Sequence, residues 1–251
     1  MKTKPLPSDK AADRWQLNAH AIAVPAGTFT GDFYYTVRSD ERFRFALGDV
    51  TGKGLRAAVI MAMIQETLEA RLGSAQSLAD VVEEINDLLL PEMRGNRFAS
   101  LIVGELDRHG SLRLVNAGHP PALLARRDGT VEILSSTGPV TGLLRGVHWC
   151  SFSRQLSAGE SVVLYSDGVL EAESSDGDEY GLGRIQQVVS AQARDATETA
   201  RLLTTSVQEH QGGGRFLDDM TVLVVRHGER SDALPRAVRR QAEDYGRVAS
   251  T

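Results

Sequence analysis

Residues 42–54 read RFRFALGDVTGKG, and this stretch predicts the architecture of the chain. Phenylalanine and leucine side chains alternate with arginine and alanine over residues 42–47, which is the period-two pattern of a strand with one buried face. An acidic, glycine-rich turn follows at residues 48–54. Apolar residues then recur at helical spacing and predict a helix: Leu55, Ala58, Val59, Ala62 and Met63.

On both sides of this strand–turn–helix unit, the spacing of apolar residues predicts further strands and helices. Strand patterns occur at residues 16–24, 33–37, 98–106, 112–116, 122–125, 131–134, 149–156, 162–166 and 221–225. A second helix is predicted to start after an N-cap at Ser77 and to end before Pro91. Two more begin near residues 182 and 196, the latter with a capping box formed by Asp195 and Glu198. This order indicates an α+β fold of sheets with helices outside.

The length and composition indicate a single mildly acidic globular domain. The 251 residues contain 28 Lys and Arg against 33 Asp and Glu, so the net charge of −5 argues against a nucleic-acid partner. The longest apolar run, residues 57–64, is far shorter than the ~20 residues that span a bilayer. Cys150 is the only cysteine and no secretory signal is visible, so we expect a cytoplasmic protein. We expect a polar leader at 1–14, a catalytic domain at 15–227 and an Arg-rich tail at 228–251.

Four aspartates lie at the ends of otherwise apolar strands, mostly beside a glycine. They are Asp32, Asp49, Asp167 and Asp218. Carboxylates gathered from strand ends are the oxygen ligands that Mg²⁺ and Mn²⁺ prefer. The alternative is that Asp and Gly simply form turns, which is the better interpretation for any one position taken alone.

Other chemistries fit the sequence less well. The stretch 48–54 lies where a P-loop would, but it is one residue short of that motif, and Gly54 stands where the Mg²⁺-binding hydroxyl should be. The histidines show no zinc-binding spacing, and no G-x-S-x-G nucleophile motif is present. His119, within NAGHPP at 116–121, is interpreted as part of a turn with a hydrogen-bonded imidazole, and a role near the site is the alternative.

Five motifs in order resemble one family. They are GDFY at 31–34, GDVTGKG at 48–54, NAGHPP at 116–121, YSDGVLEA at 165–172 and DDMT at 218–221. Together they resemble bacterial metal-dependent protein phosphatases of the PPM type, in the stage II sporulation protein E-like branch. The resemblance runs from about residue 15 to residue 225.

The resemblance implies a four-layer α-β-β-α sandwich with two central, mainly antiparallel sheets and a site for two Mn²⁺ or Mg²⁺ ions. Asp32, Asp49 and the backbone carbonyl of Val50 would hold one ion, with Asp49 bridging both. Asp167 and Asp218 would hold the other. Glu171 and Asp219 are further candidates for metal contact, and Lys53 is a candidate for contact with the substrate phosphate.

The implied activity is hydrolysis of phosphoserine or phosphothreonine by a water activated between the two ions. The implied substrate is an anti-anti-sigma factor in a partner-switching pathway. Thr30 and Tyr35 depart from the family pattern of a second glycine and an acidic residue, so a phosphatase-like binding module without turnover is the alternative. Regulation would come from a separate protein, from homodimerisation or from the tail.

Overall fold

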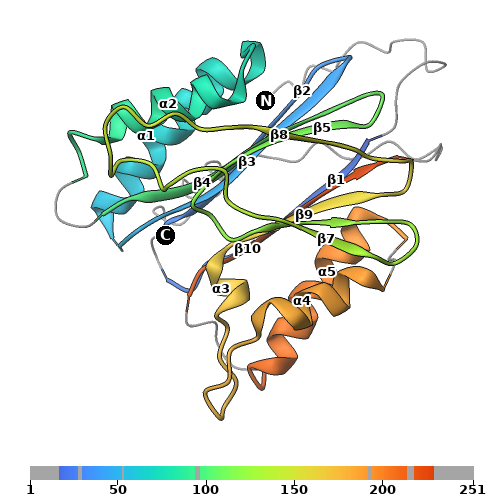
Figure 1. Ribbon diagram of the computed structural model, residues 1–251. Helices are drawn as coiled ribbons and strands as arrows, with labels where there is room; N and C mark the ends of the chain where they lie inside the picture. Colours follow the sequence, from blue (N-terminus) through green and yellow to red (C-terminus); the bar gives the residue numbers. More distant parts are fainter. Residues whose placement is uncertain are drawn as a thin grey trace, which may run out of the picture.

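The computed structural model describes residues 17–27, 30–52, 54–93, 97–191, 194–213 and 218–228. The predicted leader and nearly all of the predicted tail lie outside these residues, as does Lys53. Within this part of the chain the elements form four layers, with two sheets in the middle and helices on both outer sides (Figure 1). The predicted α+β sandwich is confirmed.

The described strands form two five-stranded sheets in which every strand pair is antiparallel. The first sheet has the order β2-β3-β4-β5-β8, made of Asp32–Arg38, Arg42–Val50, Ala99–Asp107, Ser111–Ala117 and Phe152–Gln155. The second has the order β1-β10-β9-β6-β7, made of Leu17–Val24, Met220–His227, Ser161–Tyr165, Ala122–Ala125 and Val131–Leu134.

Helices cover the outer face of each sheet (Figure 1). α1 (Leu55–Arg71) and α2 (Leu78–Leu89) pack on the first sheet, joined by the 3₁₀ turn η1 (Leu72–Ser74). α4 (Gly181–Ser190) and α5 (Ala196–His210) pack on the second, next to the short α3 (Asp167–Leu170). None of the helices in the described residues is both long and apolar enough to cross a bilayer.

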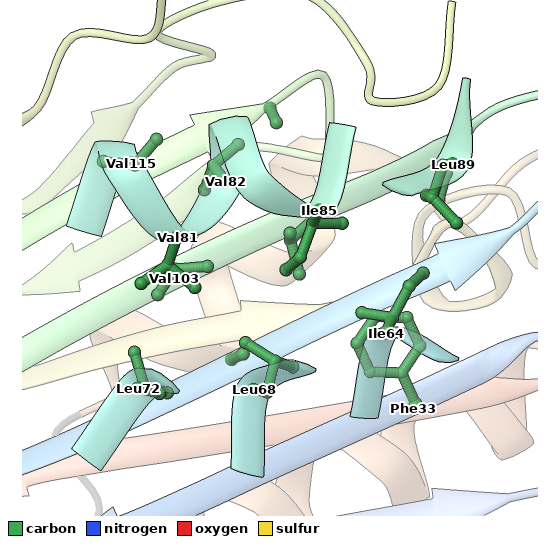
Figure 2. Packing of buried hydrophobic residues seen from close by; sticks show 14 of the residues in the cluster. Phe33, Ile64, Leu68, Leu72, Val81, Val82, Ile85, Leu89, Val103 and Val115 are labelled. Carbon is green, nitrogen blue, oxygen red and sulfur yellow. The ribbon is translucent and has the colours of Figure 1, made fainter. Parts of the chain in front are cut away.

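Helix α2 shows how the sequence builds an outer layer. Its apolar residues recur at helical spacing, so Val81, Val82, Ile85 and Leu89 all face the sheet (Figure 2). The predicted N-cap is confirmed, because the Ser77 side chain accepts a hydrogen bond from the backbone N–H of residue 80. The N-cap of α5 at Asp195 is confirmed in the same way.

Two elements differ from the sequence-based expectation. Strand β8 covers only Phe152–Gln155, because Trp149 instead lies in a loop where its indole Nε1 donates to the carbonyl of Pro139 at 2.8 Å. Helix α3 was not predicted, since four residues are too few to show a helical period.

Strand alternation decides which side chains lie between the sheets. Phe43, Phe45 and Leu47 of β3 belong to the apolar cluster between the two sheets. Successive side chains of a strand point to opposite faces, so Asp49, at the next position of the same parity, continues this row to its end. The space between the sheets therefore changes from apolar to acidic at one edge of the sandwich.

Candidate metal centre

Three aspartates from three separate strand ends meet at that edge. Asp32 begins β2, Asp49 lies one residue before the end of β3, and Asp167 follows β9 at the start of α3. One carboxylate oxygen from each lies within 4.8 Å of the others. The structure thus brings together three of the four aspartates selected from the sequence.

Asp32 is the most enclosed of the three, with 2% of its surface exposed. Its Oδ2 accepts a hydrogen bond from the hydroxyl of Thr221, on β10 of the opposite sheet, at 2.7 Å. Its backbone N–H donates to the hydroxyl of Thr30 at 3.1 Å. Thr30, which departs from the family pattern, thereby holds the backbone of Asp32 and removes no carboxylate.

The carboxyl groups of Asp32 and Asp49 resist ionisation. Burial raises the pKa of Asp32 to about 8, and the negative charge of Asp49 adds to the effect. Burial raises the pKa of Asp49 to about 7, helped by the charges of Asp167 and Asp218. Burial and the charge of Asp218 also raise the pKa of Asp167. For buried carboxylates this close together to be ionised at the same time, a compensating positive charge is needed.

This donor set fits a hard divalent cation. Mg²⁺ and Mn²⁺ take carboxylate and carbonyl oxygens and keep several waters, so they suit a partly open site of this kind. A bound cation would also favour the ionised form of each carboxyl group. We find no other group of three or more ligating side chains at this spacing among the described residues.

Asp218 and Glu171 lie at the exposed rim of the cluster. Asp218 is outside the 4.8 Å group, yet its charge acts on both Asp49 and Asp167. Burial raises the pKa of Glu171, and the negative charge of Asp167 raises it further. Both carboxylates are therefore within electrostatic range of the centre, on its solvent side.

The carboxylate of Asp219 is turned toward the connection between β1 and β2. Its Oδ1 accepts from the backbone N–H of Ala26 at 2.8 Å, and its Oδ2 accepts from the backbone N–H of Gly31 at 3.0 Å. Each oxygen of Asp219 therefore has a backbone donor.

Gly31 is packed too closely to carry a side chain. A Cβ there would lie 2.5 Å from Oδ1 of Asp49 and 2.7 Å from the carbonyl oxygen of Val50. The Val50 N–H also donates to the carbonyl of Gly31 at 3.2 Å. Glycine is thus required here by close approach to Asp49 and Val50 rather than by a positive φ angle.

His119 occupies a buried position beside the centre. Its Nδ1 shares a hydrogen bond with the hydroxyl of Ser100 at 2.7 Å, and Ser100 is the cross-strand neighbour of Asp49. Burial lowers the pKa of His119 to about 3, so the imidazole is neutral. The prediction of a turn with a hydrogen-bonded imidazole is confirmed.

Tyr35, the second departure from the family pattern, lies on the opposite face of β2 from Asp32. It packs, partly buried, against the apolar cluster under α1 and α2. Its phenol is therefore part of the packing of the outer layer and does not point between the sheets.

The sequence is similar to those of known bacterial phosphatases. The family model described as "Stage II sporulation protein E (SpoIIE)" matches residues 39–228. The phosphoserine phosphatase RsbU of Bacillus subtilis is 27% identical over an alignment of 216 residues, and this alignment covers 84% of this chain and 63% of RsbU. The chain therefore spans less than two thirds of the length of that relative.

Solved structures share the fold. The PP2C phosphatase domain of SpoIIE from Bacillus subtilis, with a fragment of its regulatory domain, superposes with a TM-score of 0.75 at 23% identity, covering 86% of this chain and 64% of that one. RsbX, crystallised in complex with magnesium, gives a TM-score of 0.64 at 13% identity, covering 86% and 97%.

Proposed function

The chain belongs to the stage II sporulation protein E family of PPM-type (PP2C) phosphatases, and we propose that it is a Mn²⁺- or Mg²⁺-dependent serine/threonine protein phosphatase. The observation that carries this proposal is the meeting of Asp32, Asp49 and Asp167 at one edge of the sandwich. Three converging carboxylates form an oxygen-donor set that suits a divalent cation. Their raised pKa values are typical of a functional site.

In this proposal two ions are held by the residues selected from the sequence. Asp32, Asp49 and the carbonyl of Val50 would hold one, and Asp167 and Asp218, with Asp49, would hold the other. Glu171 is a further candidate at the rim. When bound, the ions would supply an activated water at neutral pH and offset negative charge on the phosphoryl oxygens.

The chain's own groups give the centre its shape. Thr221 fixes the orientation of the Asp32 carboxylate from the opposite sheet. Gly31 leaves room for Asp49 and Val50 to approach one another closely. Asp218 and Glu171 are exposed, so a phosphorylated side chain would approach the centre from their side. Lys53, which lies outside the described residues, stays our candidate for contact with the phosphate.

The proposed substrate is a phosphoserine or phosphothreonine on a bacterial regulatory protein of the anti-anti-sigma type, within a partner-switching pathway. Support comes from the similarity to RsbU, whose name describes a phosphoserine phosphatase. Such a substrate acts on transcription, so we propose the cytoplasm as the location. A separate regulatory protein or a homodimer would control the activity.

The test is the initial rate of hydrolysis of a chromogenic phosphate ester and of a phosphoserine peptide, with Mn²⁺, with Mg²⁺ and with a chelator. We expect turnover that needs the metal and is abolished in Asp49→Asn. Asp176→Asn is the matched control, because it removes one negative charge from an exposed residue in the loop between α3 and α4. This variant should retain the parent rate. A parent that binds the phosphopeptide but does not hydrolyse it with any metal would favour the binding module instead.

A further inference from the structure

Asp219 makes two long-range contacts that a simple metal ligand would not need. Its carboxylate accepts from the N–H groups of Ala26 and Gly31, which are 193 and 188 residues away in sequence. Both donors belong to the connection that carries the chain from the second sheet to the first. We call these two hydrogen bonds the Asp219 latch.

The backbone of Asp219 is fixed against the segment that carries Asp167. A Cβ on Gly168 would come within 2.0 Å of the Asp219 carbonyl oxygen, so the two backbones are in direct contact. Ser166 and Thr221 hold the adjoining strands together, because each donates its backbone N–H to the other, one to a carbonyl and one to a hydroxyl, at 2.9 Å. The latch therefore has a rigid base on β9 and β10.

The other end of the latch acts through Gly31. The N–H of Gly31 is held by Asp219, its carbonyl accepts from Val50, and its Cα lies against the carboxylate of Asp49. Asp32 is the next residue in the chain. Gly31 is therefore in contact with Asp49 and Val50 and is bonded to Asp32, which are the three residues proposed to hold the first ion. Asp219 fixes Gly31 relative to Asp167.

We propose that Asp219 is a positioning residue that sets the distance between the Asp32–Asp49 side and the Asp167 side of the centre before any ion binds. The proposal rests on the metal-centre function proposed above, and it replaces direct metal contact as the role of Asp219. Preorganised ligands lose less conformational freedom when the cation arrives, so the latch increases metal affinity.

A carboxylate suits this role better than an amide. Two N–H donors that approach from one connection need two acceptor oxygens, and a carboxylate offers both. Asparagine offers one oxygen, and its NH₂ group would face the second N–H. Glutamate keeps the charge but is one methylene longer, so it cannot place both oxygens where those of Asp219 lie.

The test compares Asp219→Asn and Asp219→Glu with the parent, and uses Asp176→Asn as the control for net charge. The first measurement is amide hydrogen exchange of Ala26 and Gly31 in the metal-free protein, followed by NMR. The second is Mn²⁺ affinity by calorimetry. The third is kcat at saturating Mn²⁺.

We expect both Asp219 variants to exchange these two amides at least tenfold faster and to bind Mn²⁺ at least tenfold more weakly, with the number of bound ions unchanged. At saturating Mn²⁺ their kcat should return to within about threefold of the parent, because no ligand has been removed. Asp176→Asn should match the parent in all three measurements.

Three outcomes would overturn the proposal. If Asp219→Glu binds Mn²⁺ like the parent while Asp219→Asn does not, charge alone matters. If both variants lose one bound ion with amide exchange unchanged, Asp219 is a ligand. If variants and parent are alike, the latch has no role, while the metal centre stands. A parent that binds no Mn²⁺ would instead remove the proposed function itself, and the positioning role with it.

Discussion

The hydroxyl of Thr221 donates to the carboxylate of Asp32 across the two sheets, with 2.7 Å between Oγ1 and Oδ2. The two residues are 189 positions apart, and both are almost completely buried. Burial opposes ionisation of Asp32, and this hydrogen bond favours it. A single hydroxyl on one sheet thus supports the charge of a proposed metal ligand on the other.

Replacing that hydroxyl should weaken metal binding. In Thr221→Val the shape is kept but the donor is lost, so the ionised form of Asp32 loses a charge-assisted hydrogen bond worth about 1.5 kcal/mol. We expect roughly tenfold lower Mn²⁺ affinity by calorimetry. Thr221→Ser, which keeps the hydroxyl, should bind nearly as the parent does. Equal affinity of the Val variant and the parent would show that Thr221 does not support the centre.

Asp32→Asn should abolish activity and yet stabilise the metal-free protein at pH 8. The pKa of Asp32 is raised in the fold, so its contribution to stability is present in acid and is lost as the pH rises through about 8. The variant has no such loss, and its free energy of unfolding at pH 8 should exceed that of the parent by roughly 2–4 kcal/mol. Urea unfolding in chelator measures this. A variant less stable than the parent at pH 8 would contradict it.

Gly31→Ala should impair the centre by steric contact alone. The added methyl group would meet Oδ1 of Asp49 at 2.5 Å, so we expect Mn²⁺ affinity to fall by tenfold or more, about 1.4 kcal/mol. Gly73→Ala is the matched control, because its nearest neighbour is a Val37 methyl at 3.8 Å. Unchanged affinity in Gly31→Ala would mean that the loop moves aside at little cost.

His119 should make the protein sensitive to acid. Its pKa is lowered to about 3 by burial, whereas an unfolded histidine has a value near 6.5. Its contribution to stability is therefore present above pH 6.5 and is lost as the pH falls toward 3. Between pH 7 and pH 5 this loss is about 2 kcal/mol. His119→Gln should show a flatter pH dependence of the free energy of unfolding, and equal slopes would contradict the assignment.

The fold was largely predictable because its signals are local. The alternation at residues 42–47 predicted β3, and the caps at Ser77 and Asp195 predicted where α2 and α5 begin. The failures have local causes as well. Helix α3 has only four residues, which are too few to show a helical repeat of apolar residues. Trp149 continues a strand-like pattern in the sequence, but in the structure it lies in a loop and its indole donates to a loop carbonyl.

The candidate site was predictable only in part. Aspartates beside glycines at strand ends indicated Asp32, Asp49 and Asp167, and the structure brings these three together. Their supporting contacts could not be predicted, because Thr221 and Asp219 reach residues in another sheet or in a distant connection. A strand pattern shows which face is buried but not which strand end lies opposite.

The central claim is that the acidic edge of the sandwich binds two divalent cations through Asp49. It is tested most directly by titrating the metal-free protein with Mn²⁺ while electron paramagnetic resonance measures the unbound ion. We predict two bound ions per chain for the parent and neither of them, at the same concentrations, for a folded Asp49→Asn variant. A parent that binds no Mn²⁺, or an Asp49→Asn variant that still binds two ions, would contradict the account.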